Sequence, residues 1–282
     1  MESKAEVLLD GLAFPEGPRW RDGRLWFSDM HDLTVKTVDF EGKVEDRVAV
    51  AGSPSGLGWL PDGRLLVVSM RDRRLLRLDP DGLALHADLS QLASFDCNDM
   101  VTDGAGRSYV GNFGFDLQVP KPAIAPAELI LVTASGEARV VARDLLFPNG
   151  TVLTPDGATL IVGESYGARL TAFDVQEDGS LSGRRVWARL EGAVPDGICL
   201  DAEGAIWVAS PLGSEVLRVE EGGRVTDRVG VSSLAIACML GGPERRHLLV
   251  CSAPSIQPEE CRAQRAGRIE VARVDVPGAG LP

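Results

Sequence analysis

Residues able to bind a cation recur at the same place in a repeated sequence unit. Each unit opens with a Pro- or Gly-containing segment, continues as a short apolar run, passes an x-D-G or related turn and ends in a β-rich run. Aligned on their turns, the units place one residue each at the start of the first run: Glu16, Ser55, Asn98, Asn149, Asp196 and, in a degraded sixth copy, Ala235. Four of these side chains end in a carboxylate or an amide, whose oxygens suit hard cations such as Ca²⁺, Mg²⁺ or Mn²⁺. Carboxylates also bind Zn²⁺ and Fe²⁺, so the residues leave the identity of the ion open.

Each of these polar residues has an alternative interpretation. Asn-Gly and Asp-Gly are common turn dipeptides, and any one of the side chains could cap a strand or hydrogen-bond a turn. Four such residues in register favour a cation site instead, because converging carboxylates repel each other unless a cation lies between them. The sequence therefore predicts one divalent ion near Glu16, Asn98, Asn149 and Asp196.

The elements that would position these residues are hairpins. Each unit indicates two strands joined by a tight turn, and further strands follow, such as 34–40 and 43–50. About four short strands in each repeat of roughly 40–50 residues are typical of propeller blades. The sequence predicts an all-β, six-bladed β-propeller of four antiparallel strands per blade, as a single domain over residues 1–282. The sequence shows no convincing amphipathic helix, and the only candidate, 90–95, is too short. Strands 5–9 and 268–276 are expected to share one blade and so to close the ring.

Propeller geometry also predicts what surrounds the ion. If each innermost strand starts at one face, the second strand returns to that face, so its end and the following loop form the rim of the pocket. The rim then includes His31, Phe113, Phe115 and Tyr166, with a Pro-rich insertion at 116–126 as a lid or pocket wall. This mixture suits a small, largely uncharged organic molecule, although rim Met and Phe residues could equally pack the loops together. His31 is expected to contact substrate or carry protons, and His86 to lie at the surface.

Composition excludes several classes of function. The formal net charge is −12 and the pI is about 4.8, so the chain lacks the basic surface that nucleic acids and anionic membranes require. Five cysteines without C-x-x-C spacing indicate reduced thiols rather than a disulfide framework or a zinc site, and Cys97 is expected to point away from the pocket. No apolar run resembles a signal peptide or a membrane span. We expect a cytoplasmic monomer or weak homodimer.

The motifs FPEGP, CND, FPNG and VPDGI, which contain the four oxygen-bearing residues, identify a resemblance. Over essentially its full length the chain resembles the senescence-marker-protein/gluconolactonase/luciferin-regenerating-enzyme family. That family consists of six-bladed propellers with one divalent ion on the axis, and many members hydrolyse lactones. The resemblance implies that Glu16, Asn149 and Asp196 are metal ligands and that Asn98 completes the site or contacts substrate.

One residue departs from the family pattern. Sugar-lactone members usually carry an Arg two residues before the Asn of the N-D motif, where it binds substrate hydroxyls, and this chain has Asp96 there. A carboxylate cannot donate those hydrogen bonds and would repel an anionic product. Gluconolactone is therefore in question as the substrate. Asp96 remains open to interpretation as a substrate contact, a second acid/base or a solvated loop residue.

The leading hypothesis is metal-assisted hydrolysis of a neutral lactone or similar cyclic ester. The ion would polarise the carbonyl, and Asp196 would act as general base toward water or hold the hydroxide that the ion provides. One alternative is serine catalysis by Ser165, whose GESYG segment matches G-x-S-x-G but lacks the strand–turn–helix context of a nucleophile elbow. Others are a non-catalytic ligand-binding propeller and a related propeller enzyme acting on another ester or an organophosphate.

Overall fold

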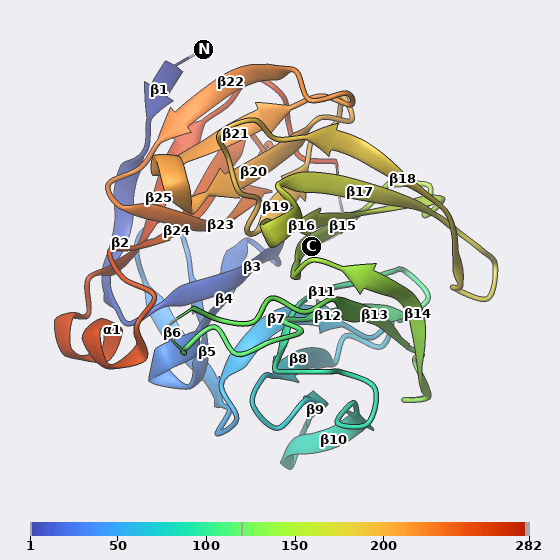
Figure 1. Ribbon diagram of the computed structural model, residues 1–282. Coiled ribbons are helices and arrows are strands. Elements are labelled where there is room, and N and C mark those ends of the chain that lie inside the picture. Colours follow the sequence, from blue (N-terminus) through green and yellow to red (C-terminus); the bar gives the residue numbers. More distant parts are fainter. Residues whose placement is uncertain (1, 120, 280–282) are drawn as a thin grey trace.

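The computed structural model describes residues 2–119 and 121–279 as six twisted sheets arranged in a ring (Figure 1). Blade 1 contains β3 (Pro15–Arg21), β4 (Arg24–Asp29), β5 (Thr34–Val38) and β6 (Val44–Ala49). Blade 2 contains β7 (Pro54–Trp59), β8 (Leu65–Ser69), β9 (Arg74–Asp79) and β10 (Gly82–Asp88). Blade 3 contains β11 (Cys97–Thr102), β12 (Ser108–Asn112), β13 (Ala127–Val132) and β14 (Ala138–Leu145).

The remaining blades follow the same plan. Blade 4 contains β15 (Pro148–Leu153), β16 (Thr159–Glu164), β17 (Arg169–Val175) and β18 (Leu181–Arg189). Blade 5 contains β19 (Ile198–Leu200), β20 (Ile206–Ser210), β21 (Glu215–Val219) and β22 (Val225–Gly230), and β1 (Glu2–Lys4) joins its outer edge in parallel. Blade 6 contains β23 (Leu234–Gly241), β24 (His247–Ala253), β25 (Gly267–Arg273) and, outermost, β2 (Glu6–Leu12). The predicted six-bladed β-propeller is confirmed.

The innermost strands form a continuous inner wall. Each of β3, β7, β11, β15, β19 and β23 contacts the next, and β23 contacts β3 again. Every residue of β7, β11 and β15 is buried, since each of these strands lies between neighbouring blades. The outermost strands β6 and β18 are largely exposed, as the edge of a blade must be. The polar residues at the starts of the inner strands are therefore held by the most rigid part of the molecule.

Glycines allow the inner strands to meet at these starts. In four blades the first polar residue is followed by glycine, at Gly17, Gly56, Gly150 and Gly197. A Cβ on Gly150 would lie 2.4 Å from the backbone nitrogen of Ile198, and one on Gly56 would lie 2.5 Å from that of Met100. The Asn-Gly and Asp-Gly dipeptides thus serve close approach of neighbouring strands, not the turns that they otherwise indicate.

The helical segments agree with expectation at one place and differ at another. Residues 90–95 form turns and bends, in agreement with the expectation that this segment is too short for a helix. The α-helix of the described residues is α1 (Pro258–Gln264), inserted between β24 and β25 and visible at the edge of the face shown in Figure 1. Proline and two glutamates in its first turn favour a helix start. Cys261 is its single buried side chain, so the sequence shows no apolar periodicity from which the helix could be predicted. No helix among the described residues is long and apolar enough to cross a membrane.

Candidate functional site

A chain of hydrogen-bonded side chains connects four consecutive blades at the axis. The Ser55 hydroxyl donates to Asn98 Oδ1 over 3.2 Å, and Asn98 Nδ2 donates to Asn149 Oδ1 over 3.0 Å. Asn149 Nδ2 in turn donates to Asp196 Oδ1 over 2.5 Å. Ser55, Asn98 and Asn149 lie in β7, β11 and β15, and Asp196 lies just before β19. The structure therefore brings together these predicted residues, which we call the axial ring together with Glu16 of β3.

The two carboxylates of the axial ring lie in each other's electrostatic field. Burial, followed by the charges of Asp196 and Asp99, raises the pKa of Glu16 well above its usual value. Burial raises the pKa of Asp196 to about 8, against the lowering effect of its hydrogen bond from Asn149. No Lys or Arg among the described residues forms an ion pair with either carboxylate. Neither group thus has an ion-pair partner among the described residues, although the charge of Arg19 lowers the pKa of Glu16.

This donor set suits a hard divalent cation. It offers two carboxylates without a cationic partner and two amide oxygens, each with a second lone pair beside the hydrogen bond that it accepts. In the described part of the chain no three His, Cys, Asp or Glu side chains gather as a metal cluster. A site of this kind would consequently depend on Asn98 and Asn149 as well as on Glu16 and Asp196.

Polar residues at the ends of the second strands fix the backbone that leads into the axial ring. Asp29, which ends β4, accepts the backbone N–H groups of Ala13 and Phe14 over 3.1 and 2.8 Å, just before Glu16. Glu164, which ends β16, accepts the N–H of Leu146 over 2.9 Å, three residues before Asn149. Blade 5 has the same interaction, in which Ser210 at the end of β20 accepts the N–H of Val194 just before Asp196. The interaction thus occurs in blades 1, 4 and 5. Sequence analysis placed these strand ends on the rim and did not recognise this positioning role.

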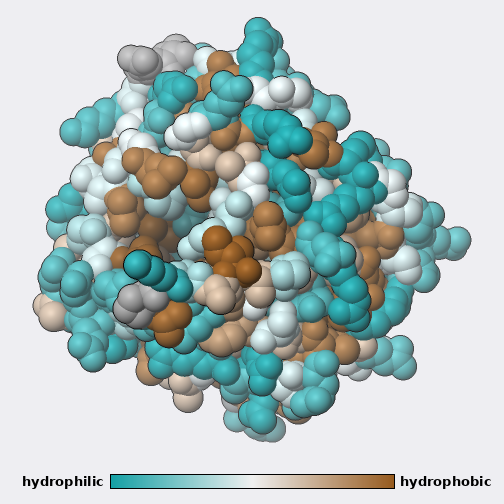
Figure 2. Space-filling model, viewed as in Figure 1, coloured by the Kyte–Doolittle hydropathy of each residue, from teal (hydrophilic) through white to brown (hydrophobic). Residues whose placement is uncertain are grey.

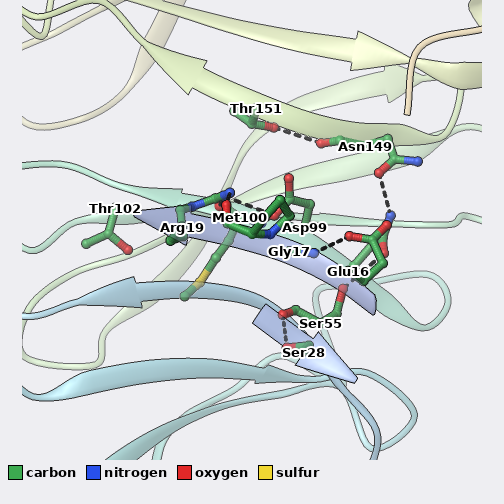
Figure 3. A network of polar contacts seen from close by, with 12 residues as sticks. Glu16, Gly17, Arg19, Ser28, Ser55, Asp99, Met100, Thr102, Asn149 and Thr151 are labelled. Atoms are coloured by element: carbon green, nitrogen blue, oxygen red, sulfur yellow. Dashed lines mark hydrogen bonds and ion pairs between the residues drawn. The ribbon is translucent and has the colours of Figure 1, made fainter. Parts of the chain in front are cut away.

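An ion pair forms the floor of the site. Arg19 of β3 reaches Asp99 of β11 over 3.1 Å and also donates to the carbonyl of Met100 (Figure 3). Both side chains are buried, and the pair spans from blade 1 to blade 3 past the intervening β7. On the far side a cavity of about 20 Å³ is lined by Arg19 together with Val101 and Ile198. Arg19 therefore contacts both this cavity and the residue that follows Asn98.

Aromatic residues form one wall beside the axial ring. The predicted rim residues Phe113, Phe115 and Tyr166 meet there, with Phe115 and Tyr166 ring centroids 5.0 Å apart. Phe147 joins them at 4.7 Å from Phe113, and it lies two residues before Asn149. Phe147 was part of the FPNG motif but was not predicted as a wall residue, since nothing in the sequence shows that its ring turns toward blade 3. We call these four residues the aromatic wall.

His31 lies apart from this wall. It belongs to a 3₁₀ turn (Met30–Asp32), is buried, and stacks on Phe14 with ring centroids 4.8 Å apart. Burial lowers its pKa to about 4, only partly offset by the backbone at Ile256. Neither ring nitrogen makes a well-formed hydrogen bond to another described protein group. His31 is thus a neutral packing residue of the rim at ordinary pH.

Asp96 is half-buried and faces positive charge. Burial raises its pKa, while the charges of Arg71 and Arg73 lower it. Arg71 follows β8 on the same rim, is exposed, and its charge also reaches His31. The proximity of Arg71 to Asp96 depends on how neighbouring blades meet, so the sequence alone does not reveal it.

Ser165 and Cys97, which lie close to residues of the axial ring, both have structural surroundings. Ser165 lies in a 3₁₀ turn (Ser165–Gly167) between β16 and β17, and its hydroxyl donates to the carbonyl of Pro195 over 2.7 Å while accepting from Asn149 over 3.3 Å. It is a structural bridge, without the strand–turn–helix setting of a nucleophile elbow. Cys97 is fully buried, and burial raises the pKa of its thiol to about 12.

Fold and site together define the class: a six-bladed propeller with an oxygen-rich polar site at one end of its axis. Residues 14–254 match the SMP-30/Gluconolactonase/LRE-like region, and the chain belongs to that family. It is similar to a 6-deoxy-6-sulfogluconolactonase of Pseudomonas putida, at 30% identity over 66% of this chain and 64% of that protein. A pentonolactonase of Haloferax volcanii is 25% identical over 95% of this chain and 92% of its own length. A regucalcin of Danio rerio is 28% identical over 59% of this chain and 57% of its own, so the chain spans under two thirds of the first and third of these relatives.

Solved structures show the same fold. A calcium-binding regucalcin from Agrobacterium tumefaciens superposes with a TM-score of 0.83 at 22% identity, covering 100% of this chain and 97% of its own. A gluconolactonase from Xanthomonas campestris superposes with a TM-score of 0.75 at 23% identity, covering 94% and 89%. At these identities the superpositions establish the architecture, and the chemistry is argued from the residues of the axial ring.

Proposed function

We propose that this protein is a divalent-metal-dependent hydrolase of a neutral lactone or similar cyclic ester. The observation that carries the proposal is the axial ring, in which two buried carboxylates and two amide oxygens converge without a cationic partner. Relatives named as lactonases supply the reaction class. Glu16, Asn98, Asn149 and Asp196 would hold the ion. When bound, the ion supplies a Lewis acid that polarises the ester carbonyl and stabilises the oxyanion.

The chain's own groups have separate tasks in this proposal. Asp196 accepts a proton from the attacking water at its carboxylate oxygen, and burial raises its pKa, which favours uptake of that proton. Asn149 orients that carboxylate through its 2.5 Å hydrogen bond. Asn98 lies next in the chain of hydrogen bonds and orients substrate or water. The aromatic wall excludes water from one side of the reacting ester.

The first experiment is elemental analysis of the protein after exposure to Ca²⁺, Mn²⁺, Zn²⁺, Mg²⁺ or Fe²⁺ and removal of free ion. We expect about one ion per chain in the native protein, and loss of the ion in the Asp196→Ala and Asn149→Ala variants. Asp96→Asn is the matched control for metal content, because Asp96 is a nearby carboxylate outside the axial ring, and it should retain the ion. A native protein that holds no ion would overturn the metal proposal.

Activity is then measured with the ion that binds, on a panel of γ- and δ-lactones and simple esters. Asp196→Ala should abolish turnover, since it removes both a ligand and the base. Turnover by this variant with a normal metal content would refute the role of Asp196 as the base. An ion-loaded native protein that hydrolyses none of the panel would instead support a ligand-binding propeller.

A further inference from the structure

Exposed apolar side chains gather around the mouth of the site. Of nine large apolar side chains that are exposed among the described residues, five lie on loops that follow second strands, on the face of the axial ring. We call these five the apolar collar: Val119, Ile124, Tyr166, Leu212 and Ile256. Figure 2, which views the same face as Figure 1, shows apolar side chains grouped around a hollow near its middle. Grouped exposure of this kind marks a binding surface more often than scattered single residues do.

The collar is continuous with the interior of the site. Tyr166 contacts Phe115 of the aromatic wall and follows Ser165, which bonds to Asn149. Val119 and Ile124 belong to the loop that carries Phe115, and this loop extends over the face in Figure 1. Leu212 belongs to a 3₁₀ turn (Pro211–Gly213) that packs against β23. The site therefore changes from charged oxygens at its floor, through phenyl rings, to aliphatic side chains at its mouth.

Covering an exposed aliphatic side chain removes apolar surface from water and lowers the free energy. The exposed side chains of the collar would therefore favour a ligand that covers them. Leu212 is 72% exposed and Tyr166 is 44% exposed, and both lie on loops at the face of the axial ring. A polyhydroxylated lactone would leave these aliphatic and aromatic surfaces uncovered, and the three Phe rings of the aromatic wall offer its hydroxyls no hydrogen-bond partner. Asp96 accepts but cannot donate hydrogen bonds when ionised. A ligand with a polar ring and an apolar tail matches both regions.

We propose that the preferred substrate is a lactone bearing an apolar substituent, with its ester directed to the axial ring and its substituent covering the apolar collar. This inference rests on the proposed lactone hydrolysis and adds the chemistry of the side group. It places the substituent over blades 3 to 6, and leaves the polar rim at Arg71 and Asp96 to solvent or to oxygens of the ring. An apolar substituent would also contact the aromatic wall beside Asn149.

The test compares γ-valerolactone, γ-nonalactone and glucono-1,5-lactone as substrates of the ion-loaded protein. Each methylene that leaves water should raise kcat/KM by about twofold or more, so the pentyl compound should exceed the methyl compound by on the order of tenfold. Leu212→Ser and Ile124→Ser should each reduce this ratio severalfold. Leu85→Ser and Val186→Ser are matched controls, since both residues are exposed and apolar but lie in the outer strands β10 and β18, and they should preserve the ratio.

A second readout does not depend on turnover. The ketone 2-pentylcyclopentanone resembles the lactone but has no ester bond, and calorimetry should show that it binds more tightly than cyclopentanone in the native protein and less so in Leu212→Ser. Collar-dependent ketone binding without hydrolysis of any lactone would refute the lactonase proposal and keep the apolar ligand. Hydrolysis without dependence on chain length, or a preference for glucono-1,5-lactone, would overturn the inference while the lactonase proposal stands.

Discussion

Three buried carboxylates near the axis differ in how their charge is balanced. Asp196 and Glu16 are carboxylates at sites where burial disfavours their charged forms, and such groups cluster at functional sites. Asp99 is also buried, but its charge is paired with Arg19. The difference lies in the partner: Asp99 forms an ion pair with a guanidinium, whereas Glu16 and Asp196 form none among the described residues, and the charge of Asp196 raises the pKa of Glu16. This contrast separates a structural acid from candidate ligands better than residue type alone.

His31 gives a prediction about stability against pH. Its folded-state pKa of about 4 lies below the usual 6.5, so between these values the unfolded chain binds a proton that the folded chain does not. Stability should therefore rise with pH across this window, by up to about 3 kcal/mol from this residue. Urea unfolding of the native protein at pH 4, 5, 6 and 7 should show this slope, and His31→Phe, which keeps the stacking on Phe14, should show less of it. Equal slopes in both proteins would contradict the assignment.

At the scale of elements, the inner strands set the spacing of the axial ring. The N–H of Gly150 donates to the carbonyl of Asp196 over 3.1 Å, so blades 4 and 5 are joined by backbone at the point where Asn149 meets Asp196. The absence of a Cβ at Gly150 permits this contact. The strands beyond them, the second in each blade, add the side-chain oxygens that hold the entering backbone. The position of each axial residue is thus determined both by the inner strand of the neighbouring blade and by the second strand of its own blade.

Gly150→Ala should separate Asn149 from Asp196. The new Cβ would lie 2.4 Å from the Ile198 nitrogen, so the strands must move apart, at a cost of roughly 1–3 kcal/mol in the free energy of unfolding. The amount of ion that the Gly150→Ala protein retains should also fall. Gly104→Ala is the matched control, because nothing lies within 4 Å of its Cβ position, and it should unfold as the native protein does. Unchanged stability and ion content in Gly150→Ala would show that the close contact is unimportant.

The sequence predicts elements and their register better than contacts between blades. The x-D-G turns and apolar runs locate the hairpins and hence the axial positions, including Asp196. The helix α1 escapes prediction because one buried residue cannot produce a periodic pattern. Phe147 and Arg71 escape because their importance lies in which neighbour each one faces across a blade boundary. The role of His31 as a substrate contact or proton carrier stays a prediction, and the burial that lowers its pKa could not be read from its residue type.

In the whole molecule, the N-terminal segment spans two blades. Strand β1 pairs in parallel with β22 of blade 5, whereas β2 pairs antiparallel with β25 of blade 6, beside strands from the other end of the chain. Ala5 and Leu12, at either end of this segment, are buried within the same apolar core as residues of blades 1, 5 and 6. The segment therefore contributes to the sheet edge and to the core at once.

Two truncations should distinguish these contributions. Removal of residues 1–12 exposes the edge of β25 and part of the core, and we expect the melting temperature to fall by about 10 °C or more. Removal of residues 1–4 takes away only the three-residue strand β1 and should lower it by less than about 3 °C. Differential scanning calorimetry measures both. Equal melting temperatures for the two truncated proteins would mean that β2 adds nothing to the fold.

The buried pair of Arg19 and Asp99 affects how substrate enters the site and how product leaves it. Because this pair crosses from blade 1 to blade 3 below the axial ring, we expect substrate to enter and product to leave on the face of the rim. A hydroxy acid formed by ring opening must leave through the mouth before the next molecule can enter. Under the proposed reaction, the product and the substrate would therefore compete for one passage, and added hydroxy acid should slow turnover as a competitive inhibitor.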